Sequence, residues 1–168
     1  MLSKIDKYRT FMSYVVSKLL YGLQTAWLTK IQRRKLDGFQ ARCLRQILGI
    51  RPSFLSRVSN QQVLSRLGAT KLSNLLLEQQ LGLFGKIARL PNTSPVRNLV
   101  FKDFSLDIRD LDIKRRRGRP RLSWISEIAR HADLAIQGSD FSFRDFIMDK
   151  ISWKRIIREY YRFKLSYE

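Results

Sequence analysis

The chain has 168 residues, and its 33 Lys and Arg against 14 Asp and Glu give a formal net charge of +19 at pH 7. Because an excess of this size repels itself in a compact state, it indicates a polyanionic partner: nucleic acid, an acidic membrane surface or an acidic protein. The hydrophobic content of 44% is too high for a disordered basic tail and predicts one or two small cores. The single Cys43 and the single His131 exclude an intrachain disulfide and a zinc finger, so we expect a reducing, intracellular compartment.

Residues 1–90 predict helices throughout. Apolar residues recur at three-to-four spacing between residues 8 and 27 and again between residues 36 and 48, which is typical of buried helical stripes. We expect Thr29 to cap the second helix and Gly49 to end it. Ser59 followed by Gln62 is a capping-box pattern that opens a short third helix, and a fourth is expected from about residue 73 to 90. No segment alternates apolar and polar residues, so no strand is expected.

Residues 91–122 interrupt this pattern. They hold three of the four prolines and end in a basic run, which predicts a linker or an extended arm. From Ser123 onward, amphipathic spacing predicts a C-terminal pair of helices. The fold class expected is therefore all-α: an irregular helical bundle (1–90), a linker with a basic arm (91–122) and C-terminal amphipathic helices (123–168). These parts carry net charges of +13, +5 and +1, so the basic excess lies on the first two.

Residues 11–28 are the one segment that resembles a signal or membrane sequence. Lys18, Gly22 and Gln24 interrupt it, and its apolar positions are periodic rather than continuous. A spanning helix needs about 20 mainly apolar residues. We therefore expect no membrane partner and no cleaved signal.

The sharpest local motif is a basic arm whose centre, Arg117-Gly118-Arg119-Pro120, resembles an AT-hook. Gly118 lets the backbone approach the floor of a minor groove, while two arginines extend along it and Pro120 keeps the chain extended. The alternatives are phosphate binding without groove preference, a nuclear localisation signal and a solvated basic run. The residues predicted to bind nucleic acid here are Lys114, Arg115, Arg116, Arg117, Gly118, Arg119, Pro120 and Arg121.

A second candidate is the outer face of the helix around residues 30–48. Helical geometry projects Arg34, Arg42 and Arg45 away from the apolar stripe, with Gly38 and Ala41 between them. Small residues flanked by arginines make a flat face that approaches a sugar-phosphate backbone closely. The alternative is an exposed face kept soluble by its charge.

No catalytic or metal site is expected from the remaining ionisable residues. The aspartates near the arm lack the ligand spacing of a known metal site, and His131 has no nucleophile at a recognisable spacing. Cys43 falls in an apolar stripe and is expected to be inert. Most Trp and Tyr residues fall at core spacing, which favours packing over base stacking. Neither a cofactor nor a small-molecule substrate is expected.

Four segments occur together in one order: LYGLQTAWLT (20–29), RKLDGFQARCLRQILGI (34–50), VSNQQVL (58–64) and KRRRGRPRLSW (114–124). Together they resemble the thumb and post-thumb region of the reverse transcriptase (RNA-directed DNA polymerase) of LINE-type, non-LTR retrotransposons. The similarity covers most of residues 12–160. It implies a nuclear, helical thumb that grips an RNA–DNA hybrid or duplex DNA, with the basic arm contacting RNA template or target DNA.

The chain departs from that family in ways that bear on activity. No two aspartates are adjacent, so the aspartate pair of the polymerase palm is absent. Lys86 stands where family members often have a histidine. The resemblance therefore implies a fragment, a decayed copy or a thumb-like remnant that does not polymerise alone, and the Mg²⁺ ions would belong to the missing palm. The alternatives are a free-standing AT-hook-like protein that binds DNA, RNA or chromatin, and an interaction scaffold.

Overall fold

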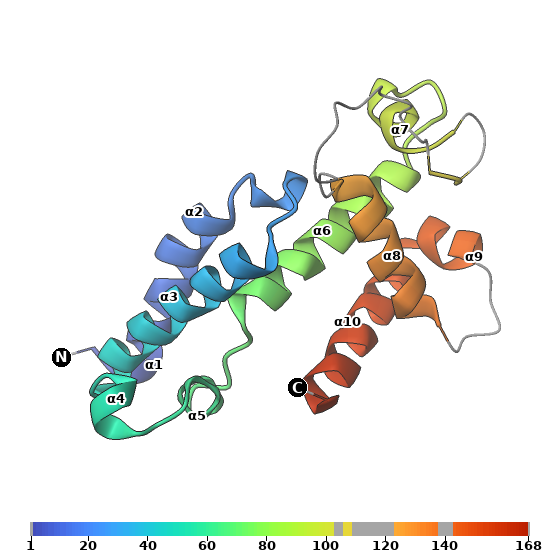
Figure 1. The fold of residues 1–168 in the computed structure, drawn as a ribbon. Coiled ribbons are helices and arrows are strands. Elements are labelled where there is room, and N and C mark those ends of the chain that lie inside the picture. Colours follow the sequence, from blue (N-terminus) through green and yellow to red (C-terminus); the bar gives the residue numbers. More distant parts are fainter. Residues whose placement is uncertain (1, 103–105, 109–122, 138–142, 168) are drawn as a thin grey trace, which may run out of the picture. The chain divides into compact units, whose positions relative to one another are not determined.

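The computed structural model describes residues 2–102, 106–108, 123–137 and 143–167 (Figure 1). The described part of the chain is all-α, as predicted, and its β-structure is limited to an isolated bridge between Phe101 and Ile108. The chain divides into two compact units, which we call unit 1 (Met1–Leu77) and unit 2 (Glu78–Glu168).

Unit 1 begins with a continuous helical run that lies beside the long helix α3 (Figure 1). The run ends at Tyr21, and Gly22 follows with a positive φ of 78° that only glycine adopts without strain. The elements of this unit are α1 (Lys4–Thr10), η1 (Phe11–Val16), α2 (Ser17–Leu20), η2 (Leu23–Thr25), α3 (Lys30–Leu48), α4 (Ser53–Ser56), α5 (Asn60–Ser65) and the start of α6 (Leu72–Ala88).

A π-helical segment changes the register of the first buried stripe. The N–H of Ser17 donates to the carbonyl of Met12, five residues earlier, instead of four. Phe11 and Val16 are therefore five residues apart and both buried, whereas Val15, expected in the core from a regular helical period, is 41% exposed. The prediction for Val15 was wrong because the extra residue in the turn rotates it away from α3.

The core of unit 1 joins the first helical run, α3, α5 and the start of α6. Each large apolar side chain removed from water contributes roughly 1.5–3 kcal/mol. The buried members are Phe11, Val16, Leu20, Leu36, Leu44, Val63, Leu64, Leu72 and Leu76. The predicted stripe of α3 is confirmed, since its other members pack against this cluster.

The predicted ends of the helices are also confirmed. Thr29 and Ser59 each form a complete capping box, with Gln32 and Gln62 respectively. Gly49 ends α3 with a left-handed φ of 73°. These local hydrogen bonds satisfy backbone groups that a helix end otherwise leaves without partners.

Two polar side chains of α3 attach the start of α6 to it. The buried Gln40 donates to the carbonyl of Thr70 (2.7 Å) and accepts from the N–H of Leu72 (2.9 Å). Asp37 accepts from both the N–H and the hydroxyl of Ser73, at 2.8 and 2.7 Å. Gln40 is 1% exposed, and these bonds replace those that it would make with water.

Unit 2 packs around the C-terminal part of α6. The Trp153 indole lies against Gly85, and its Nε1 donates to the carbonyl of Leu81 (3.0 Å). The ring of Phe84 lies 5.3 Å from that of Phe101, which is fully buried. The other helices are α7 (Pro95–Val100), α8 (Trp124–Ile136), α9 (Phe143–Met148) and α10 (Lys150–Tyr167).

The organisation of the middle of the chain differs from the expected one. The boundary between units falls at residue 77 rather than 90, because the second half of α6 packs with Trp153 and Phe101. Residues 95–100 form the helix α7 instead of an extended linker, since Val100 and Phe101 are apolar and become buried.

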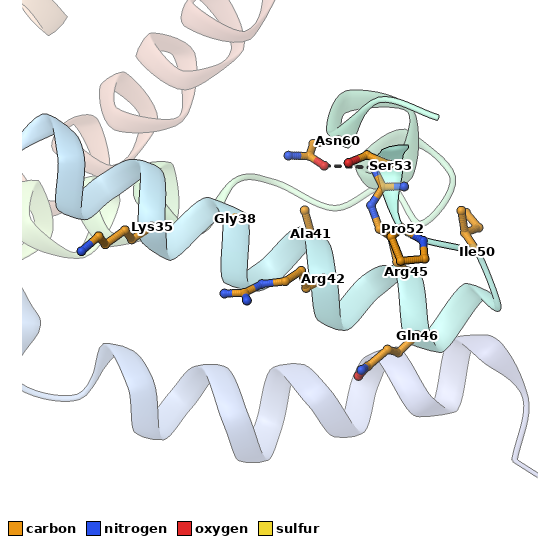
Figure 2. Close-up of a pocket in the computed structure, with 10 residues that line it drawn as sticks. All are labelled: Lys35, Gly38, Ala41, Arg42, Arg45, Gln46, Ile50, Pro52, Ser53 and Asn60. Carbon is orange, nitrogen blue, oxygen red and sulfur yellow. Dashed lines mark hydrogen bonds between the residues drawn. The ribbon is translucent and has the colours of Figure 1, made fainter. Parts of the chain in front are cut away.

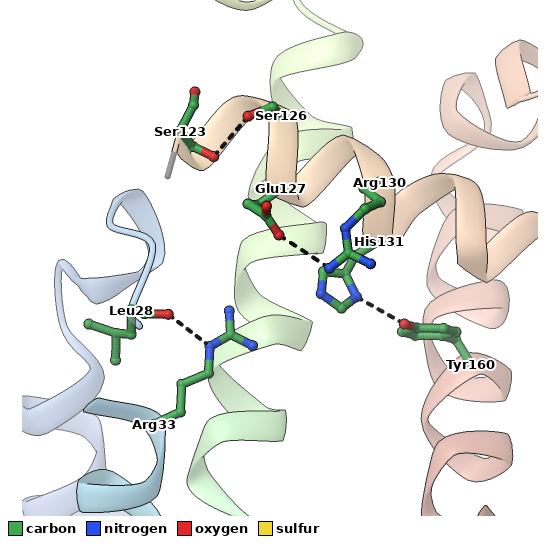
Figure 3. A network of polar contacts seen from close by, with 8 residues as sticks. All are labelled: Leu28, Arg33, Ser123, Ser126, Glu127, Arg130, His131 and Tyr160. Atoms are coloured by element: carbon green, nitrogen blue, oxygen red, sulfur yellow. Dashed lines mark hydrogen bonds and ion pairs between the residues drawn. The ribbon is translucent and has the colours of Figure 1, made fainter. Parts of the chain in front are cut away.

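Figure 3 shows the polar contacts of α8 within unit 2. His131 Nδ1 lies 2.9 Å from the hydroxyl of Tyr160 on α10, and Glu127 pairs with Arg130 at 3.2 Å. His131 is 8% exposed, so its ring is largely buried in unit 2. Separately, in unit 1, Arg33 Nε donates to the carbonyl of Leu28 (3.2 Å), and its guanidinium lies 4.0 Å from the Trp27 ring.

Candidate nucleic-acid interface

Unit 1 carries an open hollow of about 940 Å³ between α3 and the segment that contains α4 and the start of α5 (Figure 2). Among the residues that the structure describes, three cationic residues of α3 and no acidic residue line it. We call this surface the basic hollow; its lining residues are Lys35, Gly38, Ala41, Arg42, Arg45, Gln46, Ile50, Pro52, Ser53 and Asn60.

Arg45 is buried, which corrects the prediction that it projects from an exposed face. Its Nη2 donates to the carbonyl of Val58 (2.7 Å) and to the side-chain oxygen of Asn60 (3.0 Å). Its Nη1 makes longer contacts, each 3.5 Å, with the carbonyl of Arg51 and the hydroxyl of Ser56. The segment after Gly49 folds back over Arg45, leaving it 5% exposed. Helical periodicity within α3 does not report this loop.

These partners of Arg45 are all neutral. None of these partners is a carboxylate, so they do not neutralise the positive charge of Arg45 at the wall of the hollow. An anion that enters the hollow would therefore meet the fixed positive charge of Arg45 and the exposed cations Lys35 and Arg42. This arrangement favours a phosphate or another oxyanion.

The other predicted residues of α3 divide into two groups. Arg42 is exposed, as predicted, and lines the basic hollow together with Gly38 and Ala41, but Ala41, expected on the exposed face, is only 2% exposed. Arg34 is also exposed, but it is not a lining residue. Sequence reasoning missed Lys35, whose seven-residue spacing from Arg42 places both on one helical face.

Gly38 lies on this face, and no described residue packs closely enough to require a glycine there. A Cβ atom built on it would meet nothing within 4 Å. Glycine in a helix interior destabilises the helix by about 0.5–1 kcal/mol relative to alanine. Its presence on the wall of the basic hollow instead suits close approach of another molecule's backbone.

The turn that closes the hollow is held in an uncommon conformation. Arg57, directly after α4, has a φ of 54°, the one positive φ among the described non-glycine residues. Its N–H donates to the carbonyl of Ser53 (2.9 Å), and the Arg45 guanidinium holds the chain on both sides of it. Left-handed conformations of such residues persist where surrounding structure stabilises them, often at functional sites.

Three aromatic side chains of unit 1 are exposed: Tyr14 (67%), Tyr21 (89%) and Phe54 (78%). The expectation that Trp and Tyr residues pack in the core holds for Trp153, which is 1% exposed, but not for these two tyrosines. Phe54 directly follows two residues that line the basic hollow, Pro52 and Ser53.

The other predicted site residues lie outside the described part of the chain: Lys114, Arg115, Arg116, Arg117, Gly118, Arg119, Pro120 and Arg121. Among the residues that the structure does describe, no group of three or more His, Cys, Asp and Glu side chains could hold a metal ion. Partial burial raises the pKa of the Cys43 thiol, although the charge of Arg42 opposes this effect. The raised pKa favours the protonated thiol, which is less reactive than the thiolate.

No helix within the described ranges is both long and apolar enough to cross a membrane. Comparisons of the chain with protein-family models, curated proteins and solved structures found no significant match.

Proposed function

We propose that unit 1 binds nucleic acid by placing a sugar-phosphate backbone in the basic hollow, in the manner of a polymerase thumb. The observation that carries the proposal is the lining of the hollow, where the described residues include Lys35, Arg42 and the buried Arg45 but no acidic residue. Phosphate oxygens are the most general anionic ligands for such a set, and Arg binds them through a planar fork of donors.

The charge of the whole unit supports the same ligand. Residues 1–77 contain 14 Lys and Arg but only two acidic residues, a net +12. Both acidic side chains are engaged elsewhere, Asp6 with Ser3 and Asp37 with Ser73. A polyanion is therefore attracted to the unit over long range before it contacts the hollow.

The resemblance to LINE-type reverse transcriptases makes the proposal more specific. Within that family the matching region is the thumb, so the ligand would be an RNA–DNA hybrid or a duplex near a primer end. Polymerisation itself would require carboxylates on another domain to hold two metal ions. The proposed activity of this chain is therefore binding alone.

The test replaces Lys35 and Arg42 together by alanine and measures affinity for an RNA–DNA hybrid. Both side chains are exposed, so helicity is expected to stay unchanged while affinity falls about 10-fold or more. A matched control, Lys18 and Arg66 to alanine, removes the same charge from exposed positions outside the hollow and is expected to have a smaller effect. Equal losses in the two double variants would reject the hollow as the binding site.

A second candidate is a free-standing protein that reads A·T-rich DNA through Arg117-Gly118-Arg119-Pro120. It predicts that a peptide of residues 110–124 binds A·T-rich duplex nearly as tightly as the whole chain. The thumb proposal predicts that the peptide binds much more weakly than the whole chain to a hybrid of mixed sequence.

A further inference from the structure

We infer that Phe54 is a stacking platform for an unpaired base of the nucleic acid whose backbone occupies the basic hollow. The inference rests on the proposed function and narrows its ligand to one with a single-stranded segment at the site. It begins from the 78% exposure of Phe54, the one of the three exposed aromatic residues of unit 1 that directly follows residues lining the hollow.

The position of Phe54 relates the ring to the hollow. Ser53, the preceding residue, lines the hollow, and consecutive Cα atoms lie about 3.8 Å apart. Consecutive bases of one strand are separated by about 3.4 Å along a duplex axis. Phe54 itself is not a lining residue, so the base that stacks on it would belong to a nucleotide whose phosphate lies near Ser53.

The platform is held in place by the protein before any ligand arrives. Pro52 restricts the chain at the start of α4, and Arg57 closes the turn with its N–H bonded to Ser53. The buried Arg45 contacts Ser56 at the end of the same helix. A side chain presented on a fixed turn loses less conformational freedom on binding than one on a loose loop.

Phe54 is followed by a second exposed apolar residue, Leu55 (60%), so the choice between a base and an apolar protein partner depends on the charge of the adjacent hollow. The cores of protein interfaces are depleted of charged residues, whereas Phe54 lies next to a hollow lined by three cations. Sites for single-stranded nucleic acid combine a basic groove with aromatic side chains on which bases stack. Bases within a duplex already stack on their neighbours, so the free faces belong to unpaired bases.

The test measures binding of the whole chain to a labelled DNA duplex that carries a single-stranded overhang. Unlabelled single-stranded DNA and unlabelled relaxed circular duplex DNA are then compared as competitors that displace the labelled DNA. Phe54→Ala is expected to weaken competition by single strand about 5- to 100-fold and to leave competition by circular duplex unchanged. A 2-aminopurine at the first unpaired position is expected to be quenched by the wild type and not by this variant. Phe54→Trp should retain both effects.

Two controls separate stacking from other contributions. Tyr21→Ala removes an exposed aromatic ring whose residue neither lines the hollow nor adjoins a lining residue in sequence, and is expected to change neither assay. Phe54→Leu keeps apolar area but removes the ring; if it binds single strand as tightly as the wild type, stacking is rejected. Circular dichroism checks that the exposed substitutions leave the fold intact.

The failure of this inference differs from the failure of the proposed function. If the wild type binds both competitors and Phe54→Ala is unchanged or loses both equally, the stacking inference is overturned while the phosphate hollow stands. If the wild type binds neither competitor, the proposed function itself fails.

Discussion

The burial of Arg45 could not be predicted from the helix in which it lies. Its place on α3 is predictable, but its burial depends on residues 51–60, which fold over it after Gly49 ends the helix. The prediction that Arg45 projects from an exposed face was wrong, because the side chain is buried, although the residue does line the basic hollow. Its role in holding the turn was missed, because irregular loops have no periodicity to read.

Replacing Arg45 by Met is expected to destabilise the protein by about 2–4 kcal/mol, since four neutral acceptors lose their donor inside a folded turn. Arg45→Lys should recover little of this, because a single ammonium does not reproduce the planar fork. Urea denaturation measures the change. The exposed Arg42→Met is the control and should leave the midpoint nearly unchanged.

Alanine substitutions at two glycines of α6, Gly82 and Gly85, test the packing of Trp153 against this helix. A Cβ on Gly85 would lie 2.2 Å from the Trp153 indole Nε1, whereas a Cβ on Gly82 would meet nothing within 4 Å. Gly85→Ala should therefore destabilise by about 1–3 kcal/mol, and Gly82→Ala should stabilise by about 0.5–1 kcal/mol. If the two variants have the same thermal midpoint, the described packing of Trp153 is wrong.

At the scale of elements, helices and caps were predictable from the sequence. Thr29 and Ser59 each precede a Gln by three residues, and such local signals act within one turn. The π-helical turn at Phe11–Val16 was not predictable, because no residue type marks it. α7 was missed because prolines and polar residues around a short apolar segment resemble a linker.

The contact between α8 and α10 makes the stability of the folded protein depend on pH. Burial raises the pKa of Tyr160, with an opposing effect of Arg130, so the folded protein keeps the phenol proton at pH values where the unfolded chain loses it. The folded state then binds more protons than the unfolded state, and stability falls as the pH rises above about 10.

Tyr160→Phe tests this contact. It is expected to lose about 1 kcal/mol at neutral pH with the hydrogen bond to His131, and the gap from the wild type should narrow above pH 10, where only the wild type titrates. Denaturant titrations at neutral pH and at about pH 11 measure both gaps. A gap that widens with pH would contradict the described environment of Tyr160.

At the scale of the whole molecule, the uneven charge was the most informative property of the sequence. The net +12 on residues 1–77 belongs to one folded unit, and its three lining cations meet at one hollow. The unit boundary was less predictable: α6 reads as one continuous helix, and only contacts distant in sequence, such as Leu81 with Trp153, divide it.

The most direct test of nucleic-acid binding by the basic hollow is the salt dependence of affinity for B-form duplex DNA. Log K should fall linearly with log salt, at about −0.9 per neutralised phosphate, and the Lys35/Arg42 double alanine variant should have a slope shallower by up to about 1.8. The Lys18/Arg66 double variant should keep nearly the wild-type slope. A salt-independent affinity, or equal slopes for the wild type and the hollow variant, would contradict the account.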